Sequence, residues 1–399
     1  MEWKEVRLGE VADVQTGPFG SQLHKENYVN KGTPIVTVEH LGNKWFTSQN
    51  LPMVSDEDKL RLAKYCSQEG DVIFSRVGSV DRCSYVSKEY SGWLFSGRCL
   101  RVRPRSGINP EYLYYFLTNE GTKQYIRNIA VGATMPSINT KLLNEVPITI
   151  PSLDDQRRIA SILSSLDRKI ELNNKINADL EEMAQAIFKN WFVDFEPFKD
   201  GKFVDSELGM IPEGWKVGTL ADIAEITMGQ SPAGNSLNEN REGMIFYQGS
   251  SDFGFRFPSI RVFTTEPKRL AVANSVLFSV RAPVGDINVA KEECCIGRGV
   301  ASIKSKYGHD SYLFYTMKSL HKLFDSFDGE GTVFGSINKK TLSAIQILLP
   351  SDGIVEQFNN IASSFDDRIR SLSDENSRLS SLRDTLLPRL MSGELEIPE

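Results

Sequence analysis

Two long amphipathic helices are the clearest feature in the pattern of apolar and polar positions. Between Ser152 and Trp191, apolar or small residues recur at alternating steps of four and three, the spacing of a coiled-coil seam. Ser152 and the aspartates after it provide an N-terminal cap, and Pro197 prevents continuation, so we expect one helix of about 39 residues and about 60 Å. Its seam positions are Ile159, Leu163, Leu166, Ile170, Asn173, Asn177, Leu180, Ala184, Ile187 and Trp191.

The same pattern returns 199 residues later, so the chain contains a partner for the first helix. The second seam consists of Phe358, Ala362, Phe365, Ile369, Leu372, Asn376, Leu379, Arg383, Leu386 and Leu390. Asparagine on a seam lowers stability but favours one register of the partner helix. We expect an antiparallel coiled coil within one chain, because the segment between the helices must start from the far end of the first.

The rest of the chain is a duplication with an offset of 199 to 212 residues. Short apolar runs bounded by Gly, Pro, Asn and Asp predict strands, and helical spacing follows Tyr112 in the first copy and Tyr312 in the second. Matching stretches are residues 3–14 with 215–226, 72–75 with 276–279, 97–98 with 297–298, 112–115 with 312–315, and 137–141 with 336–340. The predicted fold class is therefore α+β: two similar mixed domains joined by two long helices and related by a pseudo-twofold axis.

We place the boundaries of this organisation as follows: 1–150 for the first domain, 151–196 for the first helix, 197–214 for a polar linker, 215–350 for the second domain, 351–393 for the second helix and 394–399 for the C-terminal tail.

Composition and charge narrow the possible partners. The net charge of −6 argues weakly against nucleic acid, but most of the acidity lies in the two helical segments, and the two domains are close to neutral. Any DNA contact must therefore come from local clusters or from partner subunits. Five cysteines without metal-ligand spacing predict reduced, partly buried thiols. No run of about eighteen apolar residues and no signal sequence is present, so we expect a cytoplasmic protein.

Catalytic motifs are absent from the sequence. It has no glycine-rich phosphate loop, no His-Glu-x-x-His, no Cys-x-x-Cys and no methyltransferase signature, and its four histidines lack ligand spacing. We therefore expect no catalytic residue and no metal site, and a binding function rather than an enzymatic one.

Polar loop residues are the candidates for contacts with DNA bases and phosphates. In the first half they are Ser21, Gln22, His40, Lys44, Ser75, Arg76, Ser79, Arg82, Arg98, Arg101, Arg103 and Thr134. In the second half they are Gln230, Ser231, Asn235, Gln248, Ser251, Arg256, Arg281, Arg298 and Thr332. The alternative for each is an ordinary exposed polar side chain. The alternating Arg101, Arg103 and Arg105 form either a phosphate-binding stripe or a solvated strand face, and the Arg repeated near Gly in both copies either contacts DNA or has a shared packing role.

Four stretches resemble the specificity subunit of type I restriction-modification systems. They are residues 187–197, 206–215, 147–156 and 386–395, and together the resemblance covers the whole chain. It implies two target-recognition domains that each recognise one part of a split, asymmetric DNA sequence, held apart by the coiled coil that sets the unread gap.

The resemblance also implies partners. Besides double-stranded DNA, these are two modification subunits, which bring S-adenosylmethionine and methylate adenine, and restriction subunits, which use ATP and Mg²⁺. The chain itself is expected to need no cofactor and no membrane. Phe188, Trp191 and Phe192 are plausible exposed contacts for a partner subunit, and packing on the neighbouring domain is the alternative. Two other functions stay open: a DNA-targeting subunit of another restriction-modification class, and a duplicated scaffold that never touches DNA.

Overall fold

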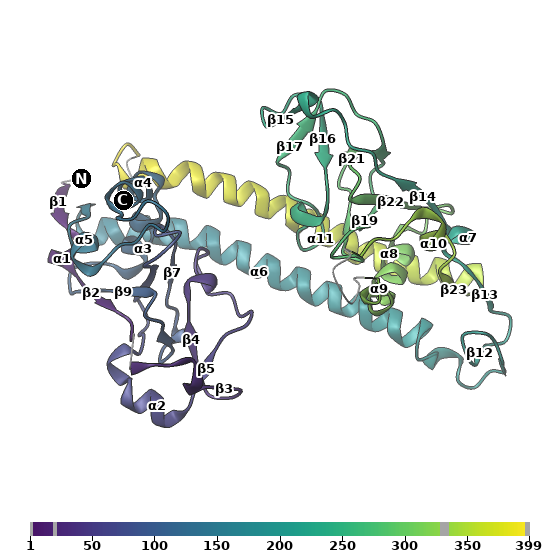
Figure 1. Cartoon of the computed structure of the whole chain (residues 1–399), viewed down its shortest axis with the longest axis horizontal. Coiled ribbons are helices and arrows are strands. Elements are labelled where there is room, and N and C mark those ends of the chain that lie inside the picture. The colour runs from purple at the N-terminus through teal and green to yellow at the C-terminus, as the bar shows by residue number, and fades with distance from the viewer. Residues whose placement is uncertain (1–2, 19–21, 328–334, 396–399) are drawn as a thin grey trace. The chain divides into compact units, whose positions relative to one another are not determined.

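The computed structural model describes residues 3–18, 22–327 and 335–395. The chain forms two compact units, unit 1 from Met1–Asn173 with Asp374–Glu399, and unit 2 from Asn174–Ser373. Each unit consists of one mixed domain and one part of each of two long helices (Figure 1).

The two long helices are α6 (Leu153–Phe192) and α11 (Asp352–Met391), each of 40 residues. In unit 1, Arg383 of α11 donates to Asp167 of α6 at 2.8 Å, and Asn173 of α6 donates to Asn376 of α11 at 2.8 Å. Residue numbers thus fall along α11 as they rise along α6, so the helices are antiparallel in unit 1. In unit 2 the ring centroids of Phe188 and Phe358 lie 5.5 Å apart, which fits the same antiparallel direction. Every predicted seam residue on both helices is buried or half-buried.

The mixed domain of unit 1 contains two four-stranded sheets, ordered β2-β9-β6-β7 and β3-β5-β4-β8, and a strand pair β1-β10. The element bounds are β1 (Lys4–Arg7), α1 (Leu8–Val11), β2 (Ala12–Thr16), β3 (Tyr28–Val29), β4 (Thr33–Val36), β5 (Met53–Val54), α2 (Asp56–Arg61), β6 (Val72–Ser75), β7 (Cys83–Tyr85), β8 (Leu94–Phe95), β9 (Cys99–Pro104), α3 (Pro110–Thr118), α4 (Glu120–Ile129), α5 (Thr140–Asn144) and β10 (Pro147–Ile150).

The mixed domain of unit 2 repeats this plan with sheets β14-β22-β19-β20 and β15-β17-β16-β21-β18 and a pair β13-β23. Its bounds are β13 (Lys216–Thr219), α7 (Leu220–Ile223), β14 (Ala224–Met228), β15 (Leu237–Asn238), β16 (Met244–Tyr247), β17 (Val262–Thr264), β18 (Leu270–Ala271), β19 (Val276–Ser279), β20 (Ile287–Val289), β21 (Cys294–Ile296), β22 (Val300–Ser305), α8 (Asp310–Ser319), α9 (His321–Asp325), α10 (Lys339–Ser343) and β23 (Gln346–Leu349). The predicted α+β class and the duplication are confirmed.

Strands β6 and β19 show why each domain has two hydrophobic clusters. Side chains alternate across a strand, so Val72 and Phe74 enter the cluster that α3 and the long helices share, while Ile73 enters the cluster of the second sheet. In unit 2, Phe278 and Leu277 divide in the same way. Both faces of these strands are buried, which explains their continuous apolar sequence.

The segment predicted as a polar linker belongs to unit 2 and contains regular structure. It carries the hairpin β11 (Phe203–Val204) and β12 (Ile211–Pro212), and Ile211 is buried. Helix α6 ends before it because Phe195 adopts a left-handed conformation with φ of 55°. The ring of Phe195 then lies 5.5 Å from that of Trp215, at the start of the second copy.

The two seam asparagines of α6 should differ in their effect on stability. Asn173 donates to Glu375 at 2.9 Å as well as to Asn376, whereas the buried Oδ1 of Asn177 has no partner among the described residues. We expect Asn173→Leu to lower the free energy of unfolding by about 1–3 kcal/mol and Asn177→Leu to raise it by about 1 kcal/mol. Urea denaturation of the two variants checks this, and shifts of the same sign would contradict it.

Candidate nucleic-acid interface

In unit 2, strand direction brings four loops to one edge of the two sheets. Met228, at the end of β14, pairs with Ala301, and Ser279, at the end of β19, pairs with Val300, so both strands end where β22 begins. Strands β16 and β21 are parallel and end together at the Tyr247 and Ile296 pair. The turn 297–299 joins β21 to β22 and so connects the two sheets at this edge.

Five predicted contact residues meet at this edge: Gln230, Ser231, Gln248, Arg281 and Arg298, which we call edge cluster 2. The hydroxyl of Ser231 donates to Oε1 of Gln248 at 2.9 Å and accepts from the backbone N–H of Arg298 at 3.3 Å. The N–H of Gln230 donates to the Ile296 carbonyl at 2.9 Å. Arg281 follows β19 and forms a β-bridge with Ser336.

The two arginines of edge cluster 2 are available to a ligand. Both are exposed, and neither forms an ion pair or a side-chain hydrogen bond with any residue in the part of the chain that the structure describes. An unpaired guanidinium can donate to phosphate oxygens or to O6 and N7 of guanine, and the amide of an exposed Gln suits adenine. The cluster therefore has the chemistry of a nucleic-acid contact.

Unit 1 has the equivalent edge, where β2, β6, β4 and β8 end and β9 begins. The N–H of Arg76 donates to the Arg98 carbonyl, and the N–H of Gly78 to the Pro136 carbonyl, both at 2.8 Å. These bonds join the loop after β6 to the 96–98 turn and to the exposed 131–137 loop. We call Arg76, Ser79, Arg98 and Thr134 edge cluster 1.

An open pocket of about 620 Å³ lies beside edge cluster 1. Its lining includes Arg98, Thr37, Glu39 and Tyr28. Arg98 is exposed and, like its counterpart Arg298, forms no ion pair or side-chain hydrogen bond with a described residue. Thr37, Glu39 and Tyr28 were not among the residues predicted from the sequence. Thr37 and Glu39 follow β4, a strand that ends at the same edge, and this position was the available signal.

Glycines hold both edges together. The N–H of Gly17 donates to the Cys99 carbonyl at 3.2 Å, and that of Gly229 to the Val300 carbonyl at 2.9 Å. A Cβ at Gly17 would collide with the Ser96 carbonyl oxygen, and one at Gly229 with the Gly297 carbonyl oxygen. The glycine repeated in the two sequence copies thus serves close backbone approach.

The predicted arginine stripe on β9 is not a phosphate-binding surface. Arg101 is buried and donates to the carbonyls of Lys64 and Cys66 at 3.3 and 3.2 Å. Arg103 binds the buried carboxylate of Asp71 with two hydrogen bonds of 2.7 Å. The prediction was wrong because the alternation of side chains along β9 places Arg101 and Arg103 toward the second sheet. There they neutralise the buried carboxylate of Asp71.

Two further predicted contacts in unit 1 are also corrected, because both are buried. His40 accepts a hydrogen bond from the N–H of Thr37 at 3.0 Å and contacts the Gln49 carbonyl at 3.0 Å. Ser75 donates to the Val77 carbonyl at 3.0 Å. Both side chains stabilise loops near the edge instead of facing solvent.

Lys44 and Arg256 are corrected for a different reason. Each is buried among acidic side chains, Lys44 beside Glu111 and Arg256 beside Glu181 and Asp366. Because both charged groups are buried and paired with carboxylates, they are not positioned to contact DNA.

Four further candidates are exposed, but no side-chain hydrogen bond within the described residues connects them to either edge cluster. Gln22 accepts a hydrogen bond from Tyr65 at 2.6 Å, and Arg82 donates to the Leu41 carbonyl. Asn235 and Ser251 are exposed in short 3₁₀ turns. Ser21 and Thr332 lie outside the described residues.

The three aromatic residues near the end of α6 are not an exposed surface for a partner subunit. Phe188 and Phe192 are buried and Trp191 is half-buried in the main hydrophobic cluster of unit 2. Phe192 lies 5.2 Å from Tyr312 and 5.9 Å from Trp215 between ring centroids. The expected exposure was wrong because this end of the helix forms part of the domain core.

The described cysteines are poor nucleophiles. All five are free thiols, four of them buried. Burial raises the pKa of Cys83 and Cys99 to about 12, so both stay protonated at neutral pH and unreactive.

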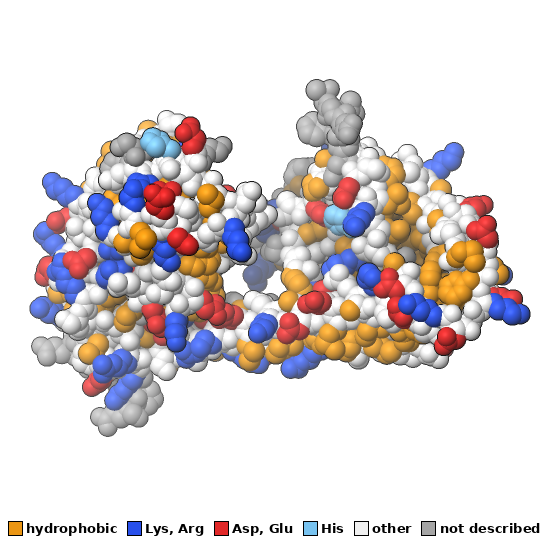
Figure 2. All heavy atoms as spheres, turned by 90° about the horizontal axis from the view of Figure 1, so that it is seen from below, with side chains coloured by type: hydrophobic (Ala, Val, Ile, Leu, Met, Phe, Trp, Pro, Cys, Tyr) orange, Lys and Arg blue, Asp and Glu red, His pale blue; other side chains and the backbone are white. Residues whose placement is uncertain are grey.

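Charge on the surface is mixed. On the face drawn in Figure 2, Lys and Arg side chains alternate with Asp and Glu. Among the described residues, no helix is both long and apolar enough to cross a membrane.

Comparison with known proteins decides the family. A family model described as the type I restriction modification DNA specificity domain matches residues 1–182 and 212–380. The chain belongs to this family. The two matches agree with the duplication, so it is a specificity subunit with two DNA specificity domains, a non-catalytic DNA-recognition component.

Individual relatives support the same family. The specificity subunit of the type I restriction enzyme MjaX from Methanocaldococcus jannaschii is 32% identical over 99% of this chain and 94% of its own length. The specificity subunit of the type I restriction enzyme HindI from Haemophilus influenzae is 26% identical over 99% of this chain and 100% of its own length. The crystal structure of a type I system S subunit from M. genitalium shares the fold, with a TM-score of 0.59 and 16% identity over 98% and 96% of the two chains.

Proposed function

We propose that this specificity subunit recognises a bipartite, asymmetric DNA target, with edge cluster 1 contacting one part and edge cluster 2 the other. The observation that carries the proposal is the repeated edge, where strand topology collects exposed polar loops in both units. Arg98 and Arg298 occupy the same turn of the two copies, and their guanidinium groups form no ion pair or hydrogen bond with a described residue.

Different neighbours of these two arginines support an asymmetric target. Arg298 lies beside Gln248 and Ser231, whereas Arg98 shares a pocket with Thr37 and Glu39. Glutamine suits adenine, and a carboxylate accepts from the amino group of cytosine. The two units thus present the same backbone framework with different hydrogen-bond donors and acceptors at the edge. This difference favours recognition of two different base sequences.

The proposed partners follow from the family. They are double-stranded DNA, two modification subunits and the restriction subunits, in the cytoplasm. S-adenosylmethionine, ATP and Mg²⁺ would be bound by those partners, and this chain would need no cofactor. The nearly balanced charge of the domains supports a shared DNA interface, because affinity for phosphates requires a basic surface that partner subunits would complete.

We also propose that the helix pair sets the gap between the two recognised parts. Helices α6 and α11 each continue from one unit into the other. Residues added to both helices would therefore add length between the two edge clusters.

Removing the guanidinium of Arg298 should weaken DNA binding by about 1–3 kcal/mol in the complex with the modification subunits. A fluorescence anisotropy titration of Arg298→Ala against salt measures both the affinity and its salt dependence. Lys306 is the matched control, because it is exposed just after the opposite end of β22. Equal losses for Arg298→Ala and Lys306→Ala would contradict the assignment of the edge.

Inserting four residues into both helices should lengthen the unread gap. Four residues add about 6 Å of helix, close to two base-pair steps of about 3.4 Å. Insertions after Asn173 in α6 and before Asp374 in α11 lie at the boundary between the units. Methylation mapping of the assembled variant gives the new target, and an unchanged gap would refute the spacer.

A further inference from the structure

Two buried cations occupy equivalent places in the duplication. Lys44 and Arg256 are separated by 212 residues, the offset that also relates Trp3 to Trp215. They are 8% and 3% exposed. Each lies a short loop beyond an edge-forming strand, Lys44 after β4 and Arg256 after β16. We call residues 37–44 loop 1 and residues 248–256 loop 2.

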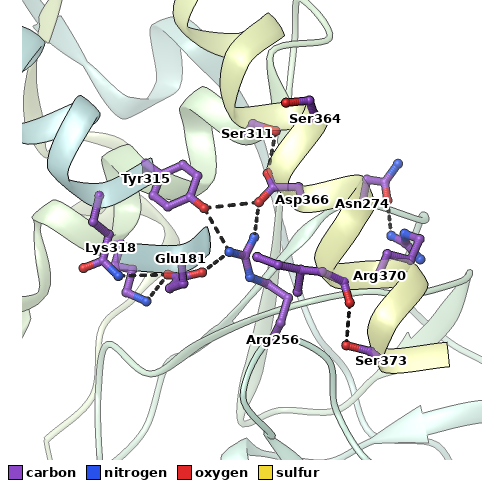
Figure 3. A network of polar contacts seen from close by, with 12 residues as sticks. Glu181, Arg256, Asn274, Ser311, Tyr315, Lys318, Ser364, Asp366, Arg370 and Ser373 are labelled. Atoms are coloured by element: carbon purple, nitrogen blue, oxygen red, sulfur yellow. Dashed lines mark hydrogen bonds and ion pairs between the residues drawn. The ribbon is translucent and has the colours of Figure 1, made fainter. Parts of the chain in front are cut away.

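In unit 2, Arg256 is the centre of a network that reaches both long helices (Figure 3). Its guanidinium binds Glu181 of α6, Asp366 of α11 at 2.6 Å, and the hydroxyl of Tyr315 at 3.0 Å. It also lies 4.1 Å from the centroid of the Phe314 ring. One side chain of loop 2 thus holds three helices together.

The partners of Arg256 are themselves paired. Lys318 binds Glu181, and Ser311 donates to Asp366 at 2.6 Å. Burial raises the pKa of Glu181, but the charges of Arg256 and Lys318 outweigh it and leave that pKa below its usual value. The carboxylate therefore stays ionised inside unit 2.

In unit 1, Lys44 occupies the corresponding position. Its ammonium donates to Glu111 at 3.0 Å and to the hydroxyl of Tyr115 at 2.9 Å, and it lies 3.7 Å from Asp167 of α6. Arg383 of α11 completes this network by donating to Asp167 at 2.8 Å. Both long helices are again connected to the loop cation.

The two networks share a core but balance their charges differently. Tyr115 and Tyr315 are equivalent, and so are Asp167 and Asp366, which are 199 residues apart like the helix seams. The other charged members differ between the units: Glu111 and Arg383 in unit 1, Glu181 and Lys318 in unit 2. Each network nevertheless contains two cations and two carboxylates. Buried charges need such pairing, and their geometry is demanding.

Each loop joins its network to the DNA-contacting edge. Loop 2 begins at Gln248 of edge cluster 2 and ends at Arg256. Loop 1 begins at Thr37, which lines the pocket beside Arg98, and ends at Lys44. The position of the helices is therefore connected to the position of base-contacting side chains through eight or nine residues.

We propose that Lys44 and Arg256 are positioning residues for DNA recognition, which set the placement of loops 1 and 2 by anchoring them to the helix pair. The proposal rests on the proposed function of the edge clusters. Neither cation contacts DNA. Each acts through its loop on the half of the target that its own unit recognises.

The test uses the full chain assembled with its modification subunits. Once methylation mapping has given the target, kcat/KM for methylation is measured on the cognate duplex and on duplexes with one base pair changed in either half. The half that loses discrimination in Arg298→Ala belongs to unit 2. Arg256→Met and Lys44→Met are suitable variants, because Glu181 keeps Lys318, and Asp167 keeps Arg383.

We expect Arg256→Met to lower discrimination about tenfold in the half of unit 2 only, and Lys44→Met to do so in the other half only. Arg368→Met, at an exposed position on α11, should leave both unchanged. A lower melting temperature with unchanged discrimination in both halves would overturn the proposal and show a purely structural role. Equal losses in both halves would also overturn it.

Two further results keep the outcomes distinct. If Arg256→Met does not assemble, Arg256→Lys replaces it. Lysine keeps the charge but cannot bind Glu181 and Asp366 together as a guanidinium does, so a partial, unit-specific loss is expected, and unchanged discrimination would again overturn the proposal. If the wild-type complex itself showed no discrimination in either half, the proposed function, and not only the role of the buried cations, would fail.

Discussion

The antiparallel packing of α6 against α11 is the interaction on which the rest of the structure depends. Side chains of both helices belong to the domain cores: Ile159, Leu163 and Leu390 in unit 1, and Phe188 and Phe358 in unit 2. Each unit therefore needs segments of both long helices to complete its hydrophobic core, and in unit 1 the α11 segment comes from the opposite end of the chain. Neither mixed domain has a full core of its own, which ties folding of the domains to pairing of the helices.

The same dependence fits the proposal that a duplicated framework recognises two different DNA sequences. Buried strands, glycines at close approaches and helix contacts repeat, and so does one arginine at each edge, while the side chains around that arginine differ. If the edges contact DNA as proposed, only the edge needs to change for a new target, because loops on a rigid scaffold tolerate substitution. The buried networks follow this rule too, since each keeps a loop cation, a tyrosine and an aspartate but obtains its remaining charges from different residues.

The periodic and repeated features could be predicted from the sequence, and the ion pairs between distant residues could not. The seam spacing gave both helices, and the repeats gave the α+β duplication, because these signals are local. Arg101 and Arg256 look like exposed loop or strand cations until Asp71 and Asp366, 30 and 110 residues away, are placed beside them. Arg98 and Arg298 remain predicted DNA contacts, now with a shared position at the sheet edge.

Domain exchange tests the central claim most directly. Residues 216–349 would be replaced by the equivalent segment of a relative with a different known target, keeping α6 and α11, and the methylated sequence of the assembled complex would be mapped. The account predicts that one part of the target changes to that of the relative while the other part and the gap stay the same. A target altered in both parts, or in neither, would contradict independent recognition by two domains on one helix pair.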